Sequence, residues 1–192
     1  MRIVGGTFRG RALASPKHEG LRPTSDRVRE SLFNILEHGV PDISLKGTRV
    51  IDLFAGTGAL GLEALSRGAD FCLFVEDRAE ARAVIRTNVE AMQLTGKSRI
   101  FRRDATNLGD AATMSAFGLA FLDPPYNTQL GAKALEALAT GGWLTPRAII
   151  VLEESAGVTV HIPDKFVEFD RRTYGDTQVI LARYDANTED ST

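Results

Sequence analysis

One stretch decides the fold of this chain: Val50-Ile51-Asp52-Leu53-Phe54-Ala55-Gly56-Thr57-Gly58-Ala59-Leu60-Gly61. Its apolar start predicts a buried strand, and its three glycines fit the spacing G-x-G-x-x-G of a turn that leads into a helix. In that pattern the first two glycines let a ligand approach the backbone closely, and the third lets the helix pack on the strand. The stretch therefore predicts a nucleotide-binding turn at the start of an α/β sheet.

Two side chains narrow the choice of nucleotide. Leu62 follows Gly61 where a Walker A loop requires Lys, which excludes that phosphate-binding loop. Asp52 stands at the end of the predicted strand, where its carboxylate would repel the pyrophosphate of NAD or FAD. The same carboxylate suits the ammonium and sulfonium groups of S-adenosylmethionine. Asp52 therefore favours this methyl donor as the cofactor.

Apolar strands alternate with helical segments from residue 48 onward, which is typical of a mostly parallel sheet covered by helices on both faces. The predicted strands are 48–53, 71–76, 98–103, 118–123 and 147–153, and the predicted helices are 59–67, 78–94 and 128–139. Two further segments, 166–173 and 177–184, predict a closing hairpin around Tyr174-Gly175-Asp176. The polar residues 185–192 are expected to be disordered.

Acidic residues mark the carboxyl ends of the predicted strands: Asp52, Glu76, Asp104, Asp123 and Glu153. In open α/β sheets ligands bind at this edge. Glu76 lies about 20 residues after the glycines, where an acid accepts hydrogen bonds from ribose hydroxyls. Asp104 and Ala105 follow the third strand and could approach an adenine ring, but a turn cap explains Asp104 equally well.

The chemistry is decided by the turn after the fourth strand, Leu122-Asp123-Pro124-Pro125-Tyr126-Asn127. Two prolines make this turn rigid and leave the Asp123 carboxylate and the Pro124 carbonyl as hydrogen-bond acceptors. An exocyclic amine on a base is a poor nucleophile because its lone pair is delocalised. Two acceptors that hold its N–H groups would aim that lone pair at a methyl carbon, while Tyr126 stacks on the base. The alternative is a proline turn whose Tyr only packs.

Composition limits the class of protein. With 192 residues and 43% hydrophobic side chains, the chain is long enough for one domain. We expect a soluble, cytoplasmic protein, since no apolar run reaches the roughly 20 residues of a membrane helix and no signal peptide is recognisable. Cys72 is the single cysteine and is expected to be buried, and the three histidines lack the spacing of metal ligands.

Positive charge is concentrated near the N-terminus. Residues 1–30 hold seven basic and three acidic side chains, a net charge of +4, whereas the whole chain carries −2. Residues 2–13 predict a small hairpin, 16–23 a loop, and 24–39 a helix capped by Thr24 or Ser25. That helix is expected to expose Arg27, Glu30 and Asn34. We interpret the basic region as a surface for RNA phosphates, with an ordinary solvated face as the alternative.

The motifs resemble a known family. Asp52–Gly61 together with Asp123-Pro124-Pro125-Tyr126 resembles the class I methyltransferases that modify exocyclic amines. The segments Gly6–Leu13, Leu21–Thr24, Val28–Asn34 and Tyr174-Gly175 are similar to the RsmD family, and the similarity spans about residues 2–184.

The resemblance implies a Rossmann-like class I methyltransferase sheet of seven strands, mostly parallel with the last pair antiparallel, and a small N-terminal hairpin-plus-helix extension. It implies a single domain over 1–184, made of an N-terminal hairpin and loop (1–23), a helix (24–39) and the core (46–184). It also implies S-adenosyl-L-methionine-dependent methylation of guanine N2 in 16S rRNA, at guanine 966. The expected substrate is a small ribosomal subunit or an assembly intermediate, and the expected enzyme is a monomer without metal or membrane.

The candidate residues divide by role. Those expected to bind the cofactor are Asp52, Phe54, Gly56, Gly58, Glu76, Asp77, Asp104 and Ala105. Those expected to act on the base are Asp123 and Pro124, which orient the amine, and Tyr126, which stacks. Those expected to meet RNA are Arg9, Arg11, Arg22 and Arg29. Arg22-Pro23-Thr24 could instead fold over the cofactor.

Three other functions stay open on sequence grounds. A nicotinamide oxidoreductase would use the glycines and Glu76, but it gives Asp52 and the Asp-Pro-Pro-Tyr turn no purpose. A methyltransferase for DNA adenine N6 or another exocyclic amine would share all of this chemistry. A noncatalytic RNA-binding module would need none of it.

Overall fold

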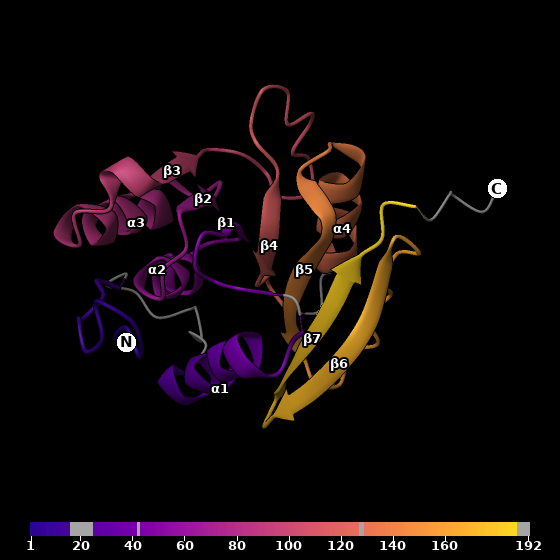
Figure 1. Ribbon diagram of the computed structural model, residues 1–192, viewed down its shortest axis with the longest axis horizontal. Helices are drawn as coiled ribbons and strands as arrows, with labels where there is room; N and C mark the ends of the chain where they lie inside the picture. The colour runs from indigo at the N-terminus through magenta and orange to yellow at the C-terminus, as the bar shows by residue number, and fades with distance from the viewer. Residues whose placement is uncertain (16–24, 42, 127–128, 188–192) are drawn as a thin grey trace. The chain divides into compact units, whose positions relative to one another are not determined.

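The computed structural model describes residues 1–15, 25–41, 43–126 and 129–187. Contacts within the chain divide it into two compact units, Met1–Arg102 and Arg103–Thr192 (Figure 1). The predicted loop 16–23, with Arg22, and the predicted tail from residue 188 onward lie outside the described residues. The single domain expected over 1–184 stays a prediction.

The first unit is built on three parallel strands among its described residues. In chain order its elements are α1 (Asp26–His38), β1 (Arg49–Leu53), α2 (Ala59–Ser66), β2 (Phe71–Val75), α3 (Ala79–Ala91), a 3-10 turn (Thr95–Lys97) and β3 (Ser98–Phe101). β2 lies between β1 and β3 and pairs with both in parallel. Nearly every side chain of β1 and β2 is buried, as expected of strands covered on both faces.

The second unit contains the remaining described strands. Its elements are β4 (Phe117–Leu122), α4 (Leu130–Thr140), β5 (Leu144–Ser155), β6 (Phe166–Tyr174) and β7 (Thr177–Tyr184). β4 and β5 are parallel, whereas β7 is antiparallel to both β5 and β6. Figure 1 shows β6 and β7 as the long yellow pair beside β5. The predicted closing hairpin is therefore confirmed.

The strand order is β3-β2-β1-β4-β5-β7-β6. This order confirms the predicted seven-stranded, mostly parallel sheet whose last pair is antiparallel. The predicted strands and helices of the core are confirmed as well, with small differences at their ends. α3 ends at Ala91, not at residue 94, because Gln93 takes a left-handed conformation with φ of 57° that ends the helix. No helix in the described part of the chain is both long and apolar enough to cross a membrane.

α1 has the two faces that its sequence predicts. Its N-cap is Ser25, whose hydroxyl accepts a hydrogen bond from the Val28 N–H at 3.2 Å. Its buried apolar face consists of Leu32, Phe33, Ile35 and Leu36. Its exposed face includes Arg27, Glu30 and Asn34, as predicted.

The N-terminal residues form the predicted hairpin, although it contains only an isolated antiparallel bridge between Arg2 and Ala12. The Ile3 N–H donates to the Arg11 carbonyl at 2.9 Å, and the Gly10 N–H donates to the Ile3 carbonyl at 2.8 Å. We call residues 1–14 the N-terminal arm.

Candidate active site

The glycine turn between β1 and α2 has an unusual backbone. Phe54, Gly56 and Gly58 have φ angles of 56°, 56° and 78°. This left-handed region suits glycine, but it costs free energy for a residue with a side chain such as Phe54. Strain of this kind persists where the surrounding structure enforces it, often at ligand sites. The Ala55 N–H donates to the Val75 carbonyl at 3.2 Å and so continues the pairing of β1 with β2 into the turn.

Two of the three glycines differ in the space around them. A Cβ added to Gly61 would lie 2.5 Å from Cys72 Sγ and 2.4 Å from the Phe74 ring, so only glycine lets α2 pack on β2. A Cβ on Gly56 would meet only the Phe54 carbonyl oxygen, at 3.8 Å. The backbone at Gly56 is therefore open to the approach of a ligand, which fits a bound cofactor.

Asp52 holds the start of α2. Its carboxylate is 2% exposed and accepts a hydrogen bond from the Gly61 N–H at 2.9 Å. Gly58, the N-cap, has no side chain to cap this helix, so Asp52 satisfies one of its first amides from the neighbouring strand. Burial raises the pKa of Asp52 to about 8, with a further increase from the charge of Glu76, although the Gly61 bond lowers it. Contact of Asp52 with a cofactor stays a prediction.

Glu76 connects the end of β2 to the glycine turn. Its carboxylate is 3% exposed and accepts hydrogen bonds from the Gly56 N–H at 2.9 Å and the Arg78 N–H at 3.0 Å. Burial by itself raises the pKa of Glu76, but hydrogen bonds from Arg78 and Gly56 outweigh it and the pKa falls below its ordinary value. Glu76 is therefore an ionised acceptor at neutral pH, as ribose binding requires.

The other predicted cofactor residues have simpler surroundings. Asp77 is exposed, and its backbone carbonyl accepts a hydrogen bond from the Arg82 guanidinium. Asp104, in the second unit, is exposed and accepts hydrogen bonds from the Thr106 N–H at 2.8 Å and the Thr106 hydroxyl at 2.7 Å. Its carboxylate thus caps a turn, the alternative that the sequence left open, and adenine binding by Asp104 and the buried Ala105 stays a prediction.

The Asp-Pro-Pro-Tyr turn directly follows β4. Pro124 is buried, and Asp123 and Tyr126 are half-buried. The Tyr126 hydroxyl donates to Glu153 Oε1 at 2.8 Å and lies 3.1 Å from the Thr177 hydroxyl. Burial raises the pKa of Tyr126, and the carboxylate of Glu153 raises it further, so the phenol keeps its proton. The turn is therefore tied through Tyr126 to β5 and β7.

Sequence reasoning did not include Glu153 among the site residues. Its side chain is 5% exposed on β5, 27 positions along the chain from its partner Tyr126. Its place in the row of strand-end acids was the available signal. The identity of the partner came only from the sheet, because β5 brings this acid to the turn.

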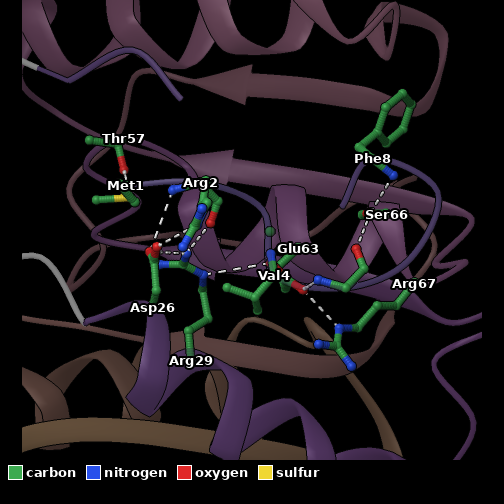
Figure 2. Close-up of polar contacts among 12 residues, drawn as sticks. Met1, Arg2, Val4, Phe8, Asp26, Arg29, Thr57, Glu63, Ser66 and Arg67 are labelled. Atoms are coloured by element: carbon green, nitrogen blue, oxygen red, sulfur yellow. Dashed lines mark hydrogen bonds and ion pairs between the residues drawn. The ribbon is translucent and has the colours of Figure 1, made fainter. Parts of the chain in front are cut away.

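The N-terminal arm is hydrogen-bonded to α2 within the first unit. Both carboxylate oxygens of Glu63 on α2 accept 2.8 Å hydrogen bonds, from the N–H groups of Val4 and Gly5. The Ser66 hydroxyl accepts from the Phe8 N–H at 3.0 Å and donates to the Gly5 carbonyl at 2.6 Å. Figure 2 shows Val4 and Phe8 held in this way along α2. The sequence contains one indication of these bonds: Glu63 is the single acid in the apolar segment 59–66, and a buried acid needs hydrogen-bond partners.

Arg29 corrects the prediction of an RNA-facing side chain. Its side chain is fully buried, and its guanidinium donates to Asp26 Oδ1 at 2.8 Å and to the Arg2 carbonyl. It also lies 3.6 Å from Glu63 Oε2 (Figure 2). The prediction is wrong because these acids hold the guanidinium inside the unit, where phosphates cannot reach it.

The other predicted RNA contacts differ in position. Arg9 and Arg11 are exposed on the arm, and Arg11 donates to the Ala91 carbonyl at the end of α3. Arg22 lies outside the described residues. Within the described ranges, no cluster of three or more His, Cys, Asp or Glu side chains could hold a metal ion.

Comparisons with known sequences agree with these features. The profile of the family described as Conserved hypothetical protein 95 matches residues 1–183. Ribosomal RNA small subunit methyltransferase D of Escherichia coli strain K12 is 40% identical over 154 residues, which cover 80% of this chain and 74% of that protein. YlbH of Bacillus subtilis strain 168, named as a candidate rRNA methyltransferase, is 34% identical over 186 residues, or 94% of this chain and 97% of that protein.

A comparison with solved structures supports the fold class. The structure of yhhF from Escherichia coli, described as a candidate methyltransferase, matches with a TM-score of 0.82 and 32% identity. The match covers 97% of this chain and 99% of that chain. The seven-stranded sheet is therefore of the class I methyltransferase type, as predicted.

Proposed function

The chain belongs to the family described as Conserved hypothetical protein 95, and from this membership we propose that it methylates the N2 amine of a guanine in 16S rRNA with S-adenosyl-L-methionine. The proposal includes guanine 966 as the target and a small ribosomal subunit or assembly intermediate as the substrate. It also includes a monomeric enzyme that works in the cytoplasm. The relatives that are named rRNA methyltransferases support the reaction and the RNA class.

Most of the residues proposed to hold the cofactor belong to the first unit. The open backbone at Gly56 and the ionised, buried carboxylate of Glu76 fit a nucleoside with a ribose diol. Phe54 and Gly58 would shape the turn, and Asp52 would support it through Gly61. Asp77, Asp104 and Ala105 complete the proposed cofactor set. The bound cofactor supplies an electrophilic methyl group.

The observation that carries the proposal is the rigid turn after β4, whose Tyr126 is tied to Glu153. The Asp123 carboxylate and the Pro124 carbonyl would accept the two N–H groups of the guanine amine. This arrangement would aim the nitrogen lone pair at the methyl carbon, and positioning of this kind can supply much of the rate. Tyr126 would stack on the base, a contact worth about 1–3 kcal/mol.

Affinity for the RNA would come from phosphate contacts, because one stack only offsets the few kcal/mol needed to extract a base. Arg9 and Arg11 on the arm are exposed and suited to this role. Arg22 would either meet the RNA or cover the cofactor.

The test is methyl transfer from tritiated S-adenosylmethionine to small subunits from a strain that lacks the enzyme, with the label mapped to a nucleotide. We expect label on a guanine N2 of 16S rRNA. Asp123→Ala should lower the rate roughly 100-fold, as expected for a lost hydrogen bond to a charged group. Asp170→Ala is the control and should not change the rate, because Asp170 lies in the same unit and its carboxylate pairs only with Arg172 among the ion pairs of the described residues.

Methyl transfer and a thermal shift assay together decide between the alternatives. Label on DNA, with none on rRNA, would support the adenine methyltransferase. A thermal shift with NAD but not with S-adenosylmethionine would support the oxidoreductase. Full activity of Asp123→Ala would remove the Asp-Pro-Pro-Tyr turn from the mechanism.

A further inference from the structure

Asn88 joins three parts of the first unit that are distant in sequence. It lies on α3 and is 2% exposed. Its Oδ1 accepts a hydrogen bond from the Ala14 N–H at 2.7 Å. Its Nδ2 donates to the Ala14 carbonyl at 3.2 Å and to the Thr57 carbonyl at 3.1 Å. The amide thus uses both of its donors and its acceptor to link the end of the arm to the glycine turn.

The Thr57 carbonyl is a point where the glycine turn needs restraint. Thr57 lies between Gly56 and Gly58, and glycine has more backbone freedom to lose than any other residue. The Gly56 N–H is held by Glu76 on one side of Thr57. Asn88 holds the other side. These two buried side chains restrain the turn in the left-handed conformation that opens its backbone to a ligand.

The arm is a suitable anchor for this restraint. Its other end is bonded to Glu63 and Ser66 of α2, the helix that starts at the glycine turn (Figure 2). Near Met1 the arm meets the turn again, since the Thr57 hydroxyl lies 3.6 Å from the Met1 sulfur. The arm therefore contacts both the glycine turn and the helix that follows it, and Asn88 adds a further link between the arm and the turn.

We propose that Asn88 is a positioning residue for the cofactor: it fixes the Thr57 carbonyl to the N-terminal arm and thereby presets the glycine turn. The proposal rests on the proposed function of this turn as the cofactor site. It implies that the arm, which carries Arg9 and Arg11, and the cofactor turn are energetically coupled. Loss of the Asn88 amide then weakens cofactor binding even though Asn88 itself does not touch the cofactor.

The first experiment is calorimetry of S-adenosylmethionine binding to the full chain. Asn88→Ala should weaken the affinity about 10-fold, the effect expected when a buried carbonyl loses its donor. Asn88→Asp keeps an acceptor for the Ala14 N–H but faces the Thr57 carbonyl with an oxygen, so it should weaken binding at least as much. Val89→Ala is the matched control, because Val89 is 4% exposed on the same helix and its apolar side chain cannot hydrogen-bond the turn.

The control separates positioning from general stability. All variants are measured well below their unfolding midpoints, and Val89→Ala should bind with wild-type affinity. Wild-type affinity of Asn88→Ala would overturn the inference, as would an equal loss in Val89→Ala. If the wild-type chain itself does not bind S-adenosylmethionine, the proposed function fails instead.

A second measurement needs no variant. Hydrogen exchange of the wild-type chain should show that S-adenosylmethionine slows exchange of the Ala14 amide, which donates to Asn88. The Gly39 amide, bonded to the Ile35 carbonyl at the end of α1, is the internal control and should not change. Unchanged exchange at Ala14 under saturating cofactor would overturn the coupling.

Discussion

Removal of the Tyr126 hydroxyl should separate the two contributions of this side chain. Tyr126→Phe keeps the ring that would stack on the target base, but it deletes the donor to Glu153 at 2.8 Å and the contact with Thr177 at 3.1 Å. The ring would then lose the bonds that tie it to β5 and β7. We expect a lower rate with no change in cofactor affinity, since Gly56 and Glu76 are untouched.

The size of the effect follows from the type of bond. A hydrogen bond to a charged group contributes about 1.5–3 kcal/mol, and the half-burial of Tyr126 favours the lower part of this range. Tyr126→Phe should therefore lower kcat/KM roughly 10- to 30-fold. Tyr126→Ala also loses the stack of about 1–3 kcal/mol and should fall roughly 5- to 150-fold further.

The assay is a double-mutant cycle on methyl transfer to small subunits. Glu153→Gln keeps an oxygen acceptor but removes the charge, so its loss should be smaller than that of Tyr126→Phe. The double variant should be no slower than Tyr126→Phe alone, because Glu153→Gln acts on activity only through the bond that Tyr126→Phe already removes. Tyr184→Phe, on β7 in the same unit, controls for the loss of any phenol hydroxyl.

Two results would refute this reasoning. Additive losses in the double variant would mean that Tyr126 and Glu153 act independently. Wild-type kcat/KM in Tyr126→Phe would mean that the tether does not position the ring. The comparison of Tyr126→Phe with the wild type does not depend on pH in the neutral range, because the raised pKa of Tyr126 keeps its phenol protonated there.

Four other substitutions test the remaining contacts. Glu76→Ala should weaken S-adenosylmethionine binding about 10-fold or more, measured by calorimetry, and unchanged affinity would remove Glu76 from the site. Asp52→Asn should be more stable than the wild type at pH 8, measured by urea unfolding. Burial raises the pKa of the Asp52 carboxyl from an ordinary value of 3.8 to about 8, so the stability that the protonated carboxyl contributes is lost as pH rises from 3.8 to 8. Charge reversal of Arg9 and Arg11 should raise the RNA concentration needed for half-maximal activity and spare cofactor affinity, and equal turnover at limiting RNA would contradict an RNA role. Arg29→Ala should lower the free energy of unfolding by about 1.5–3 kcal/mol, measured in urea, because it removes the hydrogen bonds of the buried guanidinium to Asp26 and the Arg2 carbonyl, whereas Glu63 keeps its ion pair with Arg67.

Local patterns were enough to predict the secondary structure, the glycine turn and the Asp-Pro-Pro-Tyr turn. The glycine spacing predicted that Gly61 lets a helix pack closely on a strand, and the structure shows that this strand is β2, since a Cβ there would lie 2.5 Å from Cys72 Sγ. Alternation of apolar strands and helical segments predicted five of the seven strands, and the closing hairpin of the other two followed from the turn residues around Gly175. Strands, helices and turns depend on residues that are close together in the sequence, so the periodicity of the sequence predicts them.

The partners of buried polar side chains could not be predicted in this way. Arg29 has the same chemistry as Arg9, yet Arg29 is buried beside Glu63 while Arg9 is exposed. Glu153 likewise bonds Tyr126, 27 positions away, and Asn88 bonds Ala14, 74 positions away. Charge and composition do not distinguish such residues before the chain has folded.

The sequence by itself determined the class of fold, the position of the glycine turn and the Asp-Pro-Pro-Tyr turn, because backbone preference and apolar periodicity are local properties. The tertiary structure alone decided that Asp52 supports α2, that Tyr126 is tied to Glu153, and that Arg29 is not a phosphate contact. The physical reason is that a buried polar group must find a partner wherever the packed strands and helices bring one within about 3 Å, and that neighbour is set by the fold, not by distance along the chain.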